Sequence, residues 1–289
     1  MASLRDIRRR IRSVSSTEQI TKAMQAVSAA RMHRAQAQVA ASRPYRDQID
    51  QVLGAVAARA KEYKHPFLVE RDGTRGLLVL VTSDRGLCGA LNVNVIRAAN
   101  QYMRGHFDSD YQVIVVGRKG RAWARRFGHR EVAEVTALGD RPPVEEVRAV
   151  AQVAMEQFMS GQVDAVVLAY AKHISALVQE PVVGTLIPVA PQDQGQGPIL
   201  GDYIYEPGAR EVLDQLLPRC VEAHIYQAVL ENLASEHSAR MVAMRNASKA
   251  AGDLIRQLTL TANKVRQATI TRELMEIVGG AEALRAQRR

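Results

Sequence analysis

The chain has 289 residues and a mass of 31.8 kDa, with 47% hydrophobic and 24% charged side chains. This balance is typical of a folded, soluble protein and excludes a disordered or collagen-like chain. The apolar runs all fall short of the ~20 residues that a membrane-spanning helix needs. The opening MASLRDIRRR also lacks the apolar stretch of a secretory signal, so we expect a cytosolic protein without direct membrane insertion.

The net charge of +9 is concentrated at the two ends of the chain. Residues 1–65 carry +8 and residues 209–289 carry +3, whereas residues 66–208 carry −2. We therefore expect the ends to meet acidic surfaces or to remain solvated. The two cysteines, Cys88 and Cys220, are too few for a disulfide framework or a four-ligand zinc site, which favours a reducing compartment.

The first 65 residues are predicted to form one long helix. Apolar residues recur three and four positions apart at Leu4, Ile7, Ile11 and Val14, then at Ile20, Met24 and Val27, and again from Ile49 to Tyr63. The six-residue step from Val14 to Ile20 predicts a local shift in the heptad register. Pro44 predicts a kink or a short break, because proline removes a backbone donor.

The last 81 residues show the same periodicity. After Glu206-Pro207-Gly208, a helix is predicted from Ala209 to about Arg285. Its apolar and small residues alternate spacings of three and four, as a coiled-coil seam does, at Met241, Met244, Ser248, Ala251, Ile255, Leu258, Ala262, Val265 and Thr269. Two long helices at opposite ends of one chain pack most economically as an antiparallel two-helix coiled coil.

The middle of the chain has a different pattern. Continuous apolar runs at 77–81, 113–116 and 165–169 are typical of buried parallel strands, and the segments 92–104, 120–127 and 143–160 are predicted helices. Residues 182–189 predict an antiparallel edge hairpin, and 191–201 a polar loop. We expect three parts: helical arm 1–65, a small, open, mostly parallel α/β (Rossmann-like) domain at 66–208, and helical arm 209–289.

One segment of this α/β domain lies where such folds bind nucleotides. The run TSDRGLCGALN, from Thr82 to Asn92, leaves a strand and enters a helix. It lacks both the dinucleotide fingerprint and the P-loop, so a structural turn is favoured, with Cys88 as a packed residue. A nucleotide-binding α/β protein with basic coiled-coil arms remains the alternative.

Other kinds of site have little support in the sequence. The seven histidines show no metal-binding spacing with one another, and no cysteine or paired carboxylate joins them. We therefore expect no catalytic residue, no cofactor and no metal. Five arginines between Arg5 and Arg12 could bind nucleic acid, but interleaved aromatic residues and a recognised module are missing, so no nucleic-acid partner is expected.

Three segments resemble the gamma subunit of F-type ATP synthases, in the same order along the chain. They are IRRRIRSVSSTEQITKAMQAVSAARMHRAQ at 7–36, SDRGLCGALN at 83–92, and the run from Ala234 to Leu284 that contains ITRELMEIVGGAEA. The last of these closely resembles the C-terminal signature of the family. The resemblance implies a non-catalytic central rotor shaft, which couples ion flow through the membrane sector to ATP synthesis or hydrolysis on other subunits.

The resemblance also implies partners and a location. The coiled coil would stand inside a ring of alternating alpha and beta subunits, and the α/β domain would lie beside the epsilon subunit and the c-ring. The absence of a transit peptide and of the cysteine pair of the plastid form favours a bacterial protein, peripheral on the cytoplasmic face of the cell membrane. No cofactor is implied.

Five positions match coupling positions of the family. Met24, in ITKAM, matches the position beside an acidic loop of beta. Polar coupling positions of the upper shaft match Arg240, Gln267, Thr271 and Glu273. From the pattern alone, Met24 could equally be a core residue of the helix, and Gln267, Thr271 and Glu273 could be ordinary surface.

Overall fold

The computed structural model describes residues 3–59, 63, 65–190, 206 and 208–286, with only the backbone described for 282–286. In chain order the elements are helix α1 (Leu4–Arg59), the 3-10 turn η1 (Pro66–Leu68), β1 (Gly76–Val81), α2 (Leu91–His106), β2 (Gln112–Val116), α3 (Arg118–Phe127), β3 (Arg130–Val135), α4 (Val144–Met159), β4 (Ala165–His173), β5 (Gln179–Ile187) and α5 (Ala209–Ala286). No helix within these ranges is long and apolar enough to cross a membrane.

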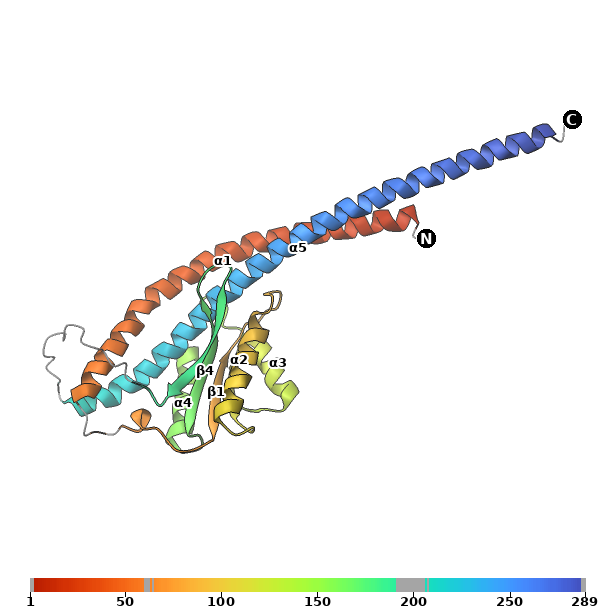
Figure 1. Cartoon of the computed structure of the whole chain (residues 1–289). Helices are drawn as coiled ribbons and strands as arrows, with labels where there is room; N and C mark the ends of the chain where they lie inside the picture. The colour runs from red at the N-terminus through yellow and green to blue at the C-terminus, as the bar shows by residue number, and fades with distance from the viewer. Residues whose placement is uncertain (1–2, 60–62, 64, 191–205, 207, 287–289) are drawn as a thin grey trace. The chain divides into compact units, whose positions relative to one another are not determined.

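The chain divides into two compact units. One contains Met1–Val27 and Ala243–Arg289, and so joins the two chain ends; the other is Ser28–Val242. The long helices α1 and α5 each contribute to both units (Figure 1). The expected loop at 191–201 lies outside the described residues.

The Ser28–Val242 unit is built on a five-stranded sheet of order β3-β2-β1-β4-β5. Strands β3, β2, β1 and β4 are parallel, and β5 returns antiparallel on β4. The predicted mostly parallel α/β domain and its antiparallel edge hairpin are both confirmed. Strand β3 was not predicted, because its sequence REVAEV mixes charged and apolar residues, as an edge strand with only partial burial permits.

Both faces of the sheet are covered, which explains the continuous apolar runs in its central strands. On one face the sheet is covered by α2 and α3 (Figure 1), against which Leu78 and Leu80 of β1 pack. On the other face, Leu77 and Val79 pack against α4 and against the parts of α1 and α5 that belong to this unit. The sheet therefore alternates its side chains between two separate apolar layers.

Helix α1 carries one unbroken buried stripe with alternating steps of three and four residues. Its members are buried or half-buried, at Leu4, Ile7, Ile11, Val14, Glu18, Thr21, Gln25, Ser28, Met32, Ala35, Val39, Ser42, Arg46, Ile49, Leu53 and Val56. The predicted register shift after Val14 is therefore wrong. Ile20 and Val27 are 57% and 52% exposed, because the stripe passes instead through small and polar residues.

The two helices run antiparallel and in contact within each unit. In the terminal unit, a Cβ built on Gly252 would lie 3.5 Å from Glu18 Oε1, so these two residues face each other. In the larger unit, Ser42 Oγ donates to Gln227 Oε1 at 2.6 Å, and Ala35 and Val39 pack on Leu230 and Ala234. The predicted antiparallel coiled coil is confirmed.

The prolines do not interrupt these helices. Pro44 lies within α1 and Pro218 within α5, and both helices continue through them. A short break at Pro44 is therefore wrong. The residues on either side of it, Val39 and Ile49, are buried against α5, and this packing offsets the loss of one backbone hydrogen bond.

Candidate functional site

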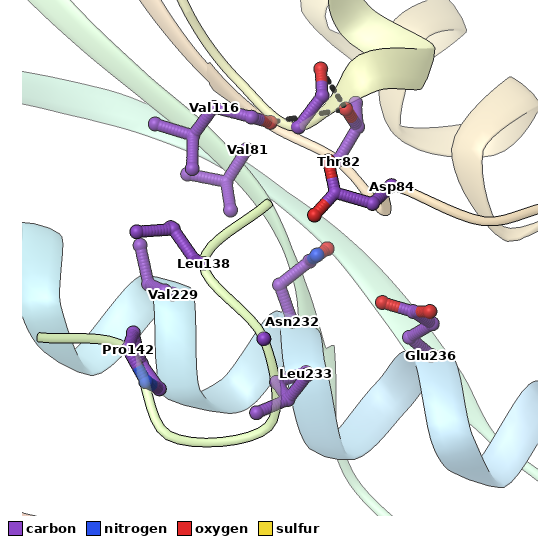
Figure 2. Close-up of a pocket in the computed structure, with 12 residues that line it drawn as sticks. Val81, Thr82, Asp84, Val116, Leu138, Pro142, Val229, Asn232, Leu233 and Glu236 are labelled. Carbon is purple, nitrogen blue, oxygen red and sulfur yellow. Dashed lines mark hydrogen bonds between the residues drawn. The ribbon is translucent and has the colours of Figure 1, made fainter. Parts of the chain in front are cut away.

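In open α/β folds, ligands bind at the carboxyl ends of the parallel strands. Here that edge of the sheet is formed by Thr82 and Asp84 after β1, Gly117 after β2 and Leu138 after β3. Figure 2 shows Thr82 and Asp84 on the opposite side of the cavity from Asn232 and Glu236 of α5. The edge therefore carries polar groups and is also covered by a helix of the same chain.

The first turn of α3 begins close to the β1 strand end. Gly117 has φ +96°, and a Cβ at this position would meet the carbonyl oxygen of Thr82 at 2.2 Å. Only glycine fits both the backbone angle and this approach. The Thr82 hydroxyl donates to Val116 O at 3.0 Å and accepts the Gly120 amide at 2.8 Å.

Helix N-termini bind phosphate through free backbone N–H groups, but the first N–H groups of α3 are already used. The amide of Arg118 donates to Asp84 Oδ1 at 3.0 Å, that of Lys119 to Ser83 O at 3.1 Å, and that of Gly120 to Thr82. Asp84 also accepts the Ala137 amide at 2.9 Å. The Thr82–Asn92 segment thus serves as a structural corner that satisfies α3.

The space left at this edge is small. The cavity between the strand ends and α5 has a volume of about 40 Å³ and is lined by Thr82, Asp84, Asn232 and Glu236, among others (Figure 2). Pockets for small-molecule ligands hold about 300–1,000 Å³. Asn232 Oδ1 accepts the Ala171 amide at 3.3 Å, and Ser235 donates to Ala171 O at 2.9 Å, so α5 is hydrogen-bonded to β4 here.

A buried ion pair follows one turn further along α5. Arg240 and Glu236 are only 6% and 7% exposed, and Arg240 Nη2 lies 2.6 Å from Glu236 Oε1. The same guanidinium donates to the carbonyl of Gly86 at 3.1 and 3.2 Å and to that of Arg85 at 3.4 Å. Burial raises the pKa of Glu236 above its ordinary value, although the charge of Arg240 acts against this. Arg240 thus links α5 to the loop at Arg85 and Gly86, which follows β1.

A second polar group lies beside this pair. His237 Nε2 is 3.3 Å from Asp140 Oδ1, and Arg31 Nε is 3.3 Å from Asp140 Oδ2. Burial lowers the pKa of His237 to about 4, so its ring is neutral near pH 7 and makes no ion pair with Asp140 there. These groups line a cavity of about 190 Å³ together with Asp84 and Arg240.

The structure distributes the five predicted coupling residues over different environments. Met24 is half-buried at the flank of the α1 stripe, rather than within it. Gln267, Thr271 and Glu273 are exposed on α5. Arg240 is buried and paired within its own unit, so an acidic partner would meet the corner that it supports rather than its guanidinium.

Among the described residues, no second helix packs against the far end of α5. The coiled-coil seam on α5 is buried or half-buried from Met244 to Val265, and every residue from 266 to 281 is exposed. This stretch extends about 24 Å at 1.5 Å per residue. It displays large apolar side chains that are 49–69% exposed, at Ile270, Leu274, Met275, Ile277 and Val278.

Sequence reasoning missed two groups of residues that the fold brings together. Glu236 and Arg240 are four residues apart on a helix, which is a visible ion-pair spacing, but their contact with the β1 corner depends on the tertiary fold. Cys220 and His224 are also four apart, and Asp50 of α1 joins them. The expectation of no metal site considered spacings among histidines and overlooked this pair.

A mostly parallel α/β domain inserted between two long helices that pack antiparallel defines the class of fold to which this chain belongs. The family described as ATP synthase matches residues 3–284. The ATP synthase gamma chain of Pelotomaculum thermopropionicum is 46% identical over 284 residues, covering 98% of this chain and all of the relative. That of Dechloromonas aromatica is 46% identical over 287 residues with the same coverage. The chain belongs to the ATP synthase gamma chain family.

Solved structures show the same fold. A chain of the Euglena gracilis mitochondrial ATP synthase, in an OSCP/F1/c-ring structure, matches with a TM-score of 0.69 at 20% identity, covering 99% of this chain and 96% of that one. A chain from the central stalk and c-ring structure of the Tetrahymena thermophila mitochondrial ATP synthase matches with a TM-score of 0.60 at 23% identity. That match covers 79% of this chain and 99% of the other.

Proposed function

We propose that this chain is the central rotor shaft of an F-type ATP synthase, coupling ion flow through the membrane sector to ATP synthesis or hydrolysis. Membership of the gamma chain family supports this function. The observation that carries it is the exposed stretch 266–281 of α5, where a single helix presents large apolar side chains. A lone helix of this length is marginal in water, and such a surface marks a place where partners bind.

The shaft itself has no catalytic role in this proposal. The sheet edge where a related fold would bind a nucleotide is covered by α5, and the first amides of α3 bond to the chain's own Asp84, Ser83 and Thr82. The reaction on ATP then belongs to the alpha and beta subunits. No cofactor is needed for a part that transmits torque.

The long helices and the α/β domain have different roles in this proposal. Residues 1–65 and 209–289 would form the shaft within the ring of alpha and beta subunits, and 66–208 would form the foot beside the epsilon subunit and the c-ring. The complex would lie peripherally on the cytoplasmic face of a bacterial membrane. The +8 charge of residues 1–65 would face acidic loops of beta, through partly solvated contacts that can be broken and remade.

The five coupling residues are part of the same proposal. Gln267, Thr271 and Glu273 are exposed on the lone stretch of α5 and can make polar contacts with the ring. Met24 is half-buried and adds an apolar contact near Lys22. Arg240 would contribute by holding the loop at Arg85 and Gly86 in place.

Co-purification from the native host tests the proposal. A tagged full-length copy should bring down alpha, beta and epsilon subunits and the c-ring, and should restore ATP-driven proton pumping to membranes stripped of their own gamma chain. A matched control carries Leu274→Asp and Ile277→Asp in the lone stretch, which should assemble less well and pump less. Recovery of the wild-type chain without these subunits would overturn the proposal.

A further inference from the structure

A cluster of three metal-ligand side chains lies between α1 and α5, away from the sheet edge. Asp50 comes from α1, and Cys220 and His224 come from α5. One ligand atom from each lies within 4.8 Å of the others. His224 Nε2 is 2.8 Å from Asp50 Oδ1, and Cys220 Sγ is 3.5 Å from the same oxygen.

The helix geometry places these side chains together. Residues four apart on a helix share one face, so Cys220 and His224 point in the same direction from α5. Asp50 follows Ile49 of the buried α1 stripe, and Ile49 and Cys220 belong to the same apolar core. The cluster therefore rests on two rigid helices whose spacing is set by packing on both sides.

The sulfur–oxygen distance suits a tetrahedral zinc ion. Zinc binds sulfur at about 2.3 Å, imidazole nitrogen at about 2.0–2.1 Å and carboxylate oxygen at about 2.0–2.2 Å, which separates sulfur from oxygen by about 3.5 Å and nitrogen from oxygen by about 3.3 Å. The sulfur–oxygen distance here is already 3.5 Å. The nitrogen–oxygen distance of 2.8 Å must open by roughly half an ångström on metal binding, which rotation of the partly exposed His224 ring can supply.

The charges in the cluster also suit a divalent ion. Burial acts to raise the pKa of Asp50, but the interactions with His224, the hydrogen bond from Cys220 and the charge of Arg46 together outweigh it, and the net pKa is lowered. Asp50 is therefore ionised near neutral pH. Burial, with the charge of Asp50, raises the pKa of Cys220 to about 12, so the free site holds a thiol.

Binding of the metal replaces the thiol proton. The sulfur–hydrogen bond of Cys220 breaks, the proton leaves to solvent, and the sulfur electron pair forms the bond to zinc. Thiolate, carboxylate and Zn²⁺ together are neutral, which limits the cost of burying the ion. The other charged group facing Asp50 is Arg46, which lies 2.6 Å from Asp47 in an ion pair of its own.

The site also has access and room for a fourth ligand. The side chains of His224 and Asp50 are 34% and 17% exposed, whereas Cys220 is buried. Beside His224 lies a cavity of about 170 Å³, lined also by Arg46 and Gln227. Water from this cavity can occupy the fourth position of a three-ligand zinc site.

We propose that Asp50, Cys220 and His224 bind one zinc ion, completed by water, and that this ion links α1 to α5. The competing description is a metal-free hydrogen-bonded triad, in which Asp50 accepts from both partners. The two descriptions differ in whether the thiol gives up its proton, so they predict different spectra and different metal stoichiometries.

Cobalt titration of the purified, reduced full-length chain separates them. One Co²⁺ per chain should bind with a thiolate-to-cobalt absorption band, release one proton, and be displaced by Zn²⁺. Cys220→Ser should abolish the band, while Cys88→Ser, which alters the other cysteine, should keep it. His224→Gln and Asp50→Asn should weaken binding by at least about tenfold, as losses around metal sites do.

Folding of each variant is followed without metal by circular dichroism. If Cys220→Ser does not fold, the partly exposed His224→Gln decides the matter through its Co²⁺ affinity. Zinc should also raise the unfolding temperature of the wild type and of Cys88→Ser, because it binds only the folded chain tightly. No absorption band in the wild-type chain, or unchanged affinity in His224→Gln, would overturn the proposal.

Discussion

Replacement of Arg240 by methionine tests whether α5 and the β1 corner are held together by a buried charge. The change keeps most of the side-chain volume but removes the partner of Glu236, which is 7% exposed. It also removes the donors to the carbonyls of Arg85 and Gly86. The carboxyl of Glu236 is then left with Asp84 and Asp140 among its charged neighbours, and both of these disfavour its ionised form.

The expected loss of stability follows from the burial of the Glu236–Arg240 ion pair. Breaking a buried ion pair by removing one partner typically lowers the free energy of unfolding by about 3–5 kcal/mol. In the double variant Glu236→Leu/Arg240→Met, the orphaned carboxylate is gone, and only the unpaired carbonyls should cost about 1–2 kcal/mol. The double variant should therefore be more stable than Arg240→Met alone.

The loss of folding stability in Arg240→Met should also depend on pH. The pKa of Glu236 in the fold is raised above its ordinary value of 4.5, and loss of Arg240 raises it further. A carboxyl with a raised pKa favours the folded state when protonated, so the variant gains stability as pH falls from 7 towards 4.5. Below pH 4.5 the Glu236 carboxyl is protonated in both the folded and the unfolded chain, and its contribution to the loss of stability disappears.

Urea unfolding followed by tryptophan fluorescence measures these differences. The chain has one tryptophan, Trp123, which is 8% exposed in α3 and so reports on the α/β part alone. The exposed Arg245 supplies the matched control, and Arg245→Met should change stability by less than about 0.5 kcal/mol. A cost below about 1 kcal/mol for Arg240→Met at pH 7, or one that stays constant down to pH 4.5, would refute the reasoning.

Three further predictions concern coupling, packing and ligand binding. Met24→Lys adds a cation where an acidic loop of beta is proposed, and a charge-assisted bond of about 1.5–3 kcal/mol should lower proton pumping per ATP while hydrolysis persists. The control Ala23→Lys, on an exposed face, should leave pumping per ATP unchanged, and equal effects of the two changes would contradict the role assigned to Met24. Gly117→Ala should unfold the α/β part at lower urea concentration, because its Cβ meets Thr82 O at 2.2 Å, whereas Gly105→Ala in open space should not. Calorimetry with ATP should detect no stoichiometric binding to the isolated chain, and a one-to-one isotherm would show that the sheet edge can open.

The sequence predicted the elements best where a single periodicity extends over many residues. The helical arms and the three central strands follow directly from spacings that burial imposes. The α1 stripe from Glu18 to Ser28 was misassigned because Ile20 and Val27 are more apolar than the Thr21 and Gln25 that occupy the seam. Residue type is a weak guide where small polar side chains can be buried by helix packing and hydrogen-bond locally, as the Thr21 hydroxyl does to Glu18 O.

The functional groups were less accessible to sequence reasoning. Asp84 and Arg240 are separated by more than 150 residues, and only the tertiary fold shows that the Asp84 corner and α5 meet. The same holds for Asp50 and Cys220. The resemblance to a family supplied the function, whereas only the fold shows that Asp84 binds the first amide of α3 and that α5 covers this edge of the sheet.

The helix that covers the sheet edge has a consequence for competition. Because α5 belongs to the same chain, its effective concentration at the sheet edge is high and does not fall on dilution. A diffusing ligand would have to displace it. Moving α5 away from Thr82 would also uncover Val229 and Ile225, which belong to the main apolar core. We therefore expect α5 to stay on this edge of the sheet, because leaving it would expose part of the main apolar core.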